Sequence, residues 1–150
     1  MPMSPYVQGL RAQVGQSLLL LPGVTAVFRR ESRFLIARQR DTEFWSLIGG
    51  GIEPFEEPAD ALRREVEEEL GVTPILKLVV GAYGGPELAS TLPNGDRVSY
   101  VTVAYECEVP DENFELEKQE LIEVAWHDLA TIVTLPRHTW IDRVIHDTVR

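Results

Sequence analysis

The hydrophobic and polar positions along the chain divide it into helical and extended segments. Helical spacing is clearest over residues 58–70, where apolar side chains recur every three or four positions and a proline occupies the first turn. Gly71, directly after this segment, is well suited to end a helix. A short amphipathic helix is expected over residues 5–14, stopped by Gly15, and a closing helix over residues 136–149.

Extended segments occupy most of the chain between these helices. Apolar runs at residues 23–28 and 34–37 flank a short polar stretch, which predicts a β-hairpin. The other expected strands are residues 44–48, 75–83, 98–107 and 120–126. No linker, repeat or low-complexity tract interrupts the pattern. We therefore expect residues 1–150 to form one α/β/α domain, with a sheet packed between helices.

Charge and composition narrow the range of partners. The chain has 150 residues, 44% of them hydrophobic, and a net charge of −10. This charge argues against a nucleic-acid backbone or an anionic membrane as the main partner. A polyanionic substrate would be repelled as well, unless divalent cations bridged it to the protein. The longest apolar run, Leu18–Leu21, is far too short to cross a bilayer.

Cysteine and histidine add little further chemistry. Cys107 is the only cysteine, so no intramolecular disulfide can form, and a reducing, cytoplasmic location is expected. No signal-peptide pattern is found at the start of the sequence. The three histidines lack metal-ligand spacing, and we expect His138 and His146 to be polar positions of the closing helix.

A dense motif coincides with the central predicted helix. Residues 50–72 read GGIEPFEEPADALRREVEEELGV, and nine of them fit the pattern G-x5-E-x7-R-E-V-x-E-E-x-G-V. At about 100° per residue, Glu65, Glu68 and Glu69 share one face next to the apolar stripe of the helix. Carboxylates at this spacing repel one another, so they either form a solvated acidic face or bind divalent cations that relieve the repulsion. Magnesium prefers oxygen ligands and keeps positions for water and substrate phosphates.

This motif resembles the Nudix box, the signature of the Nudix hydrolases, at every fixed position. The resemblance implies the Nudix fold, an α/β/α sandwich with a mixed curved sheet and a loop–helix–loop. It implies a pyrophosphohydrolase that uses Mg²⁺ or Mn²⁺ and attacks phosphorus with water. The implied substrate is a small molecule, either a nucleoside triphosphate or a nucleoside diphosphate linked to another moiety. Many members of the family are dimers, so a homodimer is among the expectations.

The resemblance also gives roles to individual residues. Glu65, Glu68 and Glu69 match the acids that bind the metals, and the carbonyl of Gly49 matches a further ligand. Glu65 and Glu68 are counted with the catalytic residues as well. Arg64 would hold a catalytic glutamate in place through a charge-assisted hydrogen bond. The outer box glutamate, Glu56, has a structural or water-mediated part in such proteins.

The motif does not identify the general base. Some family members take it from the box itself and others from a distal loop glutamate. Glu120 stands where many relatives carry such an acid, and Glu117 and Glu123 compete with it. Arg38 and Arg40 are candidates for contacting a substrate phosphate, although solvated arginines at a strand end need no such role.

Two positions depart from the common family pattern W-x-L-P-G-G-G-x-E-x-G-E. Ile48 replaces a frequent proline, so the loop loses a fixed φ. Phe55 replaces a frequent glycine, which disfavours a positive φ there. The glycines at 49–51 are expected to turn tightly and to approach a metal or a phosphate. The departures therefore concern the shape of the loop and leave the proposed ligands intact.

Two alternatives to hydrolysis stay open. A catalytically silent Nudix domain would bind a nucleotide as a sensor, but such domains usually lose box acids, and this chain keeps all of them. An isomerase of prenyl diphosphates would use a reactive cysteine near the metal, whereas Cys107 lies in the middle of a predicted strand. Substrate markers are weak, since Leu88, Ala89 and Ser90 stand where diadenosine polyphosphate hydrolases carry a tyrosine.

Overall fold

A computed structural model describes residues 3–150, which fold around a mixed sheet of eight strands. The elements are α1 (Pro5–Val14), β1 (Leu19–Arg30), β2 (Arg33–Gln39), β3 (Trp45–Ser46), β4 (Ile48–Gly51), α2 (Pro58–Leu70), β5 (Ile75–Tyr83), the 3₁₀ helix η1 (Pro86–Leu88), β6 (Ala89–Thr91), β7 (Arg97–Glu108), β8 (Leu121–Asp128), α3 (Leu129–Ile132) and α4 (Trp140–Thr148). Within residues 3–150, no helix combines the length and the apolar character needed to cross a membrane.

Strand β1 is the centre of the sheet. It pairs in parallel with β7 over ten positions, from Leu19 opposite Val98 to Phe28 opposite Cys107. It also pairs antiparallel with β4 and, through the predicted hairpin, with β2. β2 continues to β3 and β8, while β7 carries β5 and β6. The mixed sheet expected from the family resemblance is therefore confirmed.

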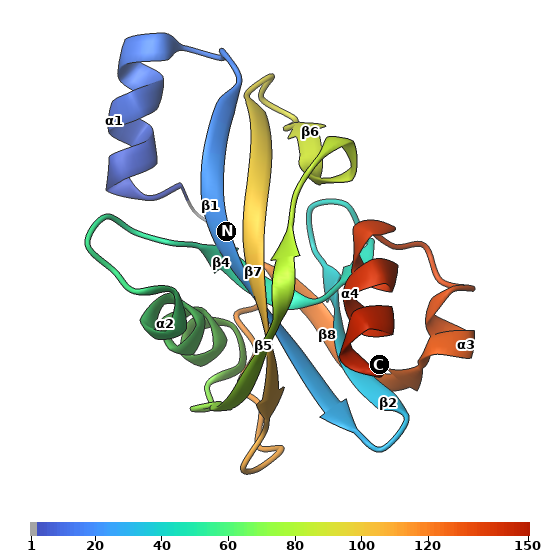
Figure 1. Cartoon of the computed structure of the whole chain (residues 1–150). Helices are drawn as coiled ribbons and strands as arrows, with labels where there is room; N and C mark the ends of the chain where they lie inside the picture. Colours follow the sequence, from blue (N-terminus) through green and yellow to red (C-terminus); the bar gives the residue numbers. More distant parts are fainter. Residues whose placement is uncertain (1–2) are drawn as a thin grey trace.

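Helices cover both faces of this sheet. α2 lies on one side, and α3 and α4 lie on the other (Figure 1). The buried apolar side chains form two clusters because each face is sealed separately from water. The α2 cluster includes Val24, Ala26, Phe28, Leu35, Leu62, Val66 and Leu70. The α4 cluster includes Val27, Phe34, Ile36, Trp45, Ile132, Ile141, Val144 and Ile145.

Helix α1 is held mainly by polar contacts. Ser4 caps it by accepting a hydrogen bond from the Val7 amide, and Gly15 ends it with φ +63°. None of its residues is buried. The Arg11 guanidinium instead donates hydrogen bonds to the carbonyls of Ser17 and Arg97, which fastens the helix beside the start of β1 and β7 (Figure 1).

Helix α4 begins later than the sequence pattern predicted. The amide of Trp45 donates to the carbonyl of Pro136, and the amide of His138 donates to the carbonyl of Trp45. Residues 136–138 therefore run alongside β3 and cannot take helical geometry. As a result, His138 lies outside the helix in which it was expected.

The glycines at 49–51 form a strand, and the prediction of a tight turn was wrong. They belong to β4 and pair with Gly23, Val24 and Thr25 of β1. Among the residues described, a positive φ at glycine is confined to Gly15, Gly71, Gly85 and Gly95. Close packing, rather than left-handed backbone geometry, therefore explains Gly49 and Gly50.

Candidate active site

Helix α2 presents two of the predicted acids to the interior and one to solvent. Its apolar stripe packs on β1 and β4, and Gly71 ends it in the left-handed conformation at φ +70° and ψ +17°. Glu65 is 1% exposed and Glu69 is 7% exposed, although both are charged residue types. Glu68 lies on the solvent side of the same helix. Burying carboxylates in this way is costly unless something compensates for the lost hydration.

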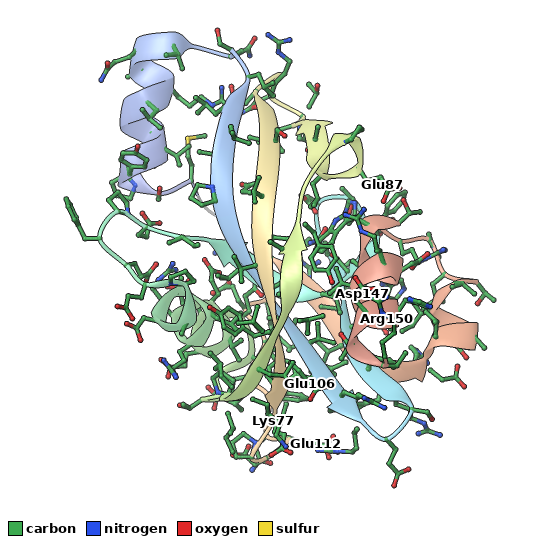
Figure 2. All side chains as sticks on the ribbon, viewed as in Figure 1. Lys77, Glu87, Glu106, Glu112, Asp147 and Arg150 are labelled. Atoms are coloured by element: carbon green, nitrogen blue, oxygen red, sulfur yellow. The ribbon has the colours of Figure 1, made fainter. Side chains whose placement is uncertain are left out.

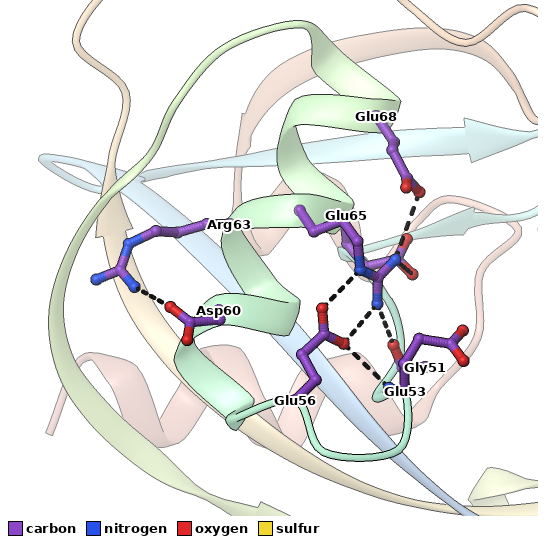
Figure 3. A network of polar contacts seen from close by, with 8 residues as sticks. Gly51, Glu53, Glu56, Asp60, Arg63, Glu65 and Glu68 are labelled. Atoms are coloured by element: carbon purple, nitrogen blue, oxygen red, sulfur yellow. Dashed lines mark hydrogen bonds and ion pairs between the residues drawn. The ribbon is translucent and has the colours of Figure 1, made fainter.

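The Arg64 guanidinium contacts groups from α2, from the loop before it and from β4. Its guanidinium binds Glu56 in a bidentate manner, with Nε–Oε2 at 2.8 Å and Nη2–Oε1 at 2.9 Å. It also donates to Glu65 Oε1 at 3.0 Å and to the Gly51 carbonyl at 2.9 Å, and lies 3.6 Å from Glu68 Oε2. Figure 3 shows Glu56, Glu65, Glu68 and Gly51 arranged around this one group. Arg64 therefore ties α2 to the loop and to β4.

The glycine strand lies directly against the buried acids. A Cβ atom at Gly50 would collide with the carboxylate of Glu65, and one at Gly49 would collide with the Val24 carbonyl. The backbone of Gly49 also acts on Glu69, since it opposes the rise in the pKa of that carboxyl. Glycine is needed at these two positions because of close approach. The structure thus brings Gly49, Glu65 and Glu69 together.

Glu120 joins this group from the segment before β8. Its backbone is fixed by two hydrogen bonds, to the Arg40 amide at 2.8 Å and to the Glu117 carbonyl at 3.0 Å. The negative charge of Glu120 raises the pKa of both Glu65 and Glu69, so it acts on the acidic cluster.

The other residues weighed beside Glu120 are engaged elsewhere. Glu123 forms an ion pair with Arg38 at 2.9 Å. The Glu117 carboxylate accepts a hydrogen bond from the Gln119 amide at 3.1 Å. The Arg40 guanidinium donates to the Lys118 carbonyl at 2.6 Å. Of the three glutamates considered for the base, only Glu120 is among the causes that raise the pKa of Glu65 and Glu69.

The protonation of the cluster follows from its burial. Burial raises the pKa of Glu65 to about 7, with Arg64 opposing the rise. Burial, aided by the charges of Glu65 and Glu120, raises the pKa of Glu69 well above its usual range. By contrast, the hydrogen bonds from Arg64 lower the pKa of Glu56. Buried acids that resist ionisation and lie close together are a common feature of functional sites.

A divalent cation fits the chemistry of these donors. Glu65 Oε2 is buried and makes no hydrogen bond to any residue in the range 3–150. Hard cations such as Mg²⁺ are bound by carboxylate and carbonyl oxygens of this kind. As the side chains stand, no three His, Cys, Asp or Glu residues of the described chain already converge as a ligand set.

A cavity of ≈ 270 Å³ adjoins the acidic cluster. It shares Gly49 and Gly50 with the cluster, and burial, aided by the charge of Glu65, raises the pKa of Tyr100 in its wall. Its lining residues are Val24, Thr25, Gln39, Ser46, Leu47, Gly49, Gly50, Glu87, Leu88, Ala89, Ser90, Tyr100, Thr102, His138 and Trp140. Its size is close to the lower end of the range of about 300–1,000 Å³ for small-molecule sites.

Most residues of this cavity were missed by the sequence analysis. They come from separate elements, so no local spacing connects them. The only sign in the sequence was the placement of Tyr100 and Thr102 at alternate positions, and so on one face, of a strand of mixed polar and apolar character. His138 had been expected on the closing helix with Trp140, but the hydrogen bonds between residues 136–138 and Trp45 place it before α4, while Trp140 begins that helix.

Curated relatives match part of the chain. It is 31% identical over 85 residues to the nucleoside triphosphatase NudI of Klebsiella pneumoniae, covering 55% of this chain and 60% of the relative. It is 31% identical over 61 residues to a putative 8-oxo-dGTP diphosphatase of Bacillus subtilis, covering 41% of each. The chain therefore spans between about two fifths and three fifths of the lengths of these relatives.

A solved structure and a family model cover more of the chain. The crystal structure of a MutT protein from Methanosarcina mazei Go1 superposes with a TM-score of 0.70, covering 87% of this chain and 93% of that one, at 21% identity. This likeness establishes the fold. The model of the NUDIX domain matches residues 19–148, from the first strand through the last helix. Because this match includes the acidic helix, the glycine strand and the sheet beneath them, the chain belongs to the NUDIX domain family.

Proposed function

We propose that this protein is a metal-dependent pyrophosphohydrolase that cleaves a phosphoric anhydride by attack of water on phosphorus. The observation that carries the proposal is the burial of Glu65 and Glu69 on the face of α2 beside the glycine strand, with Glu120 near enough for its charge to help raise the pKa of both. The full set of box acids also supports hydrolysis over a silent, nucleotide-sensing role.

The metal would be held by Glu65, Glu68, Glu69 and the carbonyl of Gly49. Mg²⁺ is the proposed ion, with Mn²⁺ as a substitute. When bound, such an ion neutralises charge on the phosphate oxygens and lowers the pKa of a coordinated water. The buried and unpartnered Glu65 Oε2 supports this assignment, since a cation would compensate for its lost hydration.

The protein's own side chains would position and deprotonate the attacking water. Arg64 restrains Glu65 and Glu56 through charge-assisted hydrogen bonds, so that Glu65 keeps one orientation. Glu120 is the proposed general base, because it is the distal carboxylate whose charge acts on the cluster. A proton from water would pass to Glu120 as the oxygen attacks phosphorus, and the anhydride oxygen would depart with the second phosphate.

The proposed substrate is a nucleoside triphosphate or a nucleoside diphosphate linked to another group. The names of the curated relatives, a nucleoside triphosphatase and a putative 8-oxo-dGTP diphosphatase, support a small nucleotide. A net charge of −10 supports a substrate that arrives together with divalent cations. We also propose that residues 1–150 work as one domain, since both core clusters cover the same sheet.

A substrate panel with a matched pair of variants tests this function. The protein is incubated with nucleoside di- and triphosphate derivatives and Mg²⁺, and released phosphate is counted with and without added phosphatase. Glu69→Gln is expected to lower turnover at least about 100-fold, because a buried ligand is lost. Glu67→Gln, on the solvent side of the same helix, should retain the activity.

Two outcomes would contradict the proposal. Absence of turnover on every compound, together with intact nucleotide binding, would favour the sensor domain. Wild-type activity of Glu69→Gln would show that the metal site has been misplaced.

A further inference from the structure

The cavity next to the acids has the composition of a site for a flat, polar ring. Leu47, Leu88 and Trp140 supply apolar and aromatic walls. The buried hydroxyls of Thr25 and Thr102 lie 2.7 Å apart and form a hydrogen bond with each other. Since ligand sites combine apolar walls with a few placed polar groups, the remaining polar side chains of the wall decide which ring is accepted.

Gln39 and His138 are two polar side chains of the cavity wall that contact each other. His138 Nε2 lies 2.9 Å from Gln39 Oε1, and the two residues come from the end of β2 and the segment before α4. The His138 backbone N–H donates a hydrogen bond to the Trp45 carbonyl, and the centroid of the Phe44 ring lies 5.5 Å from that of the imidazole. The imidazole is thus fixed independently of Gln39.

The hydrogen bond from His138 uses the oxygen of the Gln39 side-chain amide and so sets the orientation of that amide. Burial lowers the pKa of His138, so its ring is neutral at pH 7 and has one N–H donor. With Nε2–H donating to Gln39 Oε1, the carboxamide cannot flip without losing this bond. Within residues 3–150, the Gln39 NH₂ group donates no hydrogen bond. The Gln39 NH₂ group is therefore left to donate to a ligand in the cavity.

An NH₂ donor held in a fixed orientation distinguishes nucleobases by their exocyclic atoms. Guanine carries two neighbouring acceptors, O6 and N7, and thymine carries the O4 acceptor, as uracil does. Adenine and cytosine carry amino donors at the corresponding places, which would face the Gln39 donors. A donor placed opposite another donor leaves both without hydrogen-bond partners, which weakens binding.

We propose that Gln39, positioned by His138, selects nucleotides with oxo-substituted bases over those with amino-substituted bases. Gln39 contacts the base, whereas His138 is a positioning residue. Glu87, which lies beside one end of α4 and lines the cavity, contributes an acceptor at its rim (Figure 2). The inference rests on the proposed function only in taking the ligand to be a nucleotide whose phosphates lie at the acidic cluster.

Calorimetric titration without turnover tests the selection. The probes are the monophosphates of guanosine, uridine, adenosine and cytidine, each titrated into the intact protein with Mg²⁺. Guanosine and uridine monophosphates are expected to bind at least about 5-fold more tightly than the other two. Equal affinities for all four would overturn the proposal.

Substitutions test whether Gln39 and His138 cause the base preference. Gln39→Glu replaces the donors with acceptors and should invert the preference, while Gln13→Glu adds the same charge on exposed α1 and should leave it unchanged. His138→Ala should reduce the preference to within about 2-fold, and His138→Gln, which keeps an N–H donor, should restore part of it. An unchanged ratio in Gln39→Glu or His138→Ala would overturn the assignment.

The binding ratios are separable from hydrolysis. A protein that shows the base preference without releasing phosphate from any triphosphate would keep this inference and contradict the proposed function. Hydrolysis of all four triphosphates, with equal monophosphate affinities, would support the proposed function and contradict this inference.

Discussion

At the scale of single residues, the tightest fit in the site is that between Gly50 and Glu65. A Cβ on Gly50 would meet the Glu65 carboxylate, whereas a Cβ on neighbouring Gly51 would have only the Pro22 carbonyl at 3.9 Å. Both glycines belong to β4, and neither has a positive φ. The two positions therefore differ in their distance to the acid and share the same type of backbone.

Gly50→Ala is expected to displace Glu65 and lower kcat/KM about 100-fold, since a displacement of about 1 Å in an active site has that effect. Gly51→Ala, the matched control, should keep activity within a factor of about 2. Steady-state kinetics measure the loss, and circular dichroism checks that both variants are folded. Full activity of Gly50→Ala would show that Glu65 does not need its present position.

Phe55 is a strained residue that the sequence analysis partly anticipated. A phenylalanine disfavours positive φ, yet Phe55 has φ +68°, and its side chain is fully exposed. The loop backbone thus has a positive φ at position 55, although phenylalanine disfavours this conformation. A non-glycine residue in the left-handed region costs about 1–2 kcal/mol.

Phe55→Gly should remove this cost and raise the free energy of unfolding by about 0.5–1 kcal/mol, after about 0.5–1 kcal/mol is subtracted for the more flexible unfolded chain. The change corresponds to a Tm increase of about 1–4 °C for a domain of this size. Phe55→Ala, which keeps the strain, should give no increase. Thermal unfolding followed by circular dichroism makes the comparison, and a lower Tm in Phe55→Gly would contradict it.

At the scale of elements, Arg64 connects α2 to β4 and to the loop between them. The bidentate contact with Glu56 and the bond to the Gly51 carbonyl are made by one guanidinium group. Arg63, the neighbour on the exposed side of the helix, pairs with Asp60 at 3.1 Å. The two arginines differ in what they hold together, which makes them a natural pair for substitution.

Arg64→Lys should lower the free energy of unfolding by about 2 kcal/mol above pH 5, because lysine cannot make the bidentate contact. The pKa of Glu56 is lowered in the folded protein, so this stabilisation is present above the ordinary value of 4.5 and is lost as the pH falls through the lowered pKa. Denaturant unfolding of wild type and variant should therefore converge in acid. Arg63→Lys should follow wild type throughout, and a gap that persists at low pH would contradict the assignment.

The elements that the sequence predicted well are those defined by local pattern. The helix Pro58–Leu70 and the hairpin of β1 and β2 follow from periodicity, capping and a short polar connection. β4 and the late start of α4 could not be predicted, because pairing with distant segments determines them. The same division holds in the site: helical spacing brought Glu65 and Glu69 together, while Gln39 and His138 meet only in the folded chain.

At the scale of the whole molecule, the acidic cluster adds to an already negative protein. The net charge is −10, and two carboxylates lie buried against each other in α2. Such an arrangement opposes folding at neutral pH in the absence of cations. Metal binding should therefore be visible in the stability of the entire domain.

Mg²⁺ at about 100 times its dissociation constant should raise the free energy of unfolding by about 2.7 kcal/mol relative to protein in EDTA. The corresponding Tm shift is about 5–11 °C. Glu69→Gln should lose most of the shift, and Glu67→Gln should keep it, since Glu67 lies outside the cluster. Differential scanning calorimetry measures the effect, and equal shifts in wild type and Glu69→Gln would contradict the ligand assignment.

The parallel pairing of β1 with β7 also determines when the site can form during synthesis. Partners in this ladder, from Leu19 with Val98 to Phe28 with Cys107, are 79 residues apart in the chain. Contacts of such long range make folding slow compared with that of a helical bundle. The acids of α2 leave the ribosome well before β7 and Glu120 do, and a nascent chain that ends before residue 98 carries the complete sequence motif without the sheet that buries it. Activity should therefore appear late in synthesis.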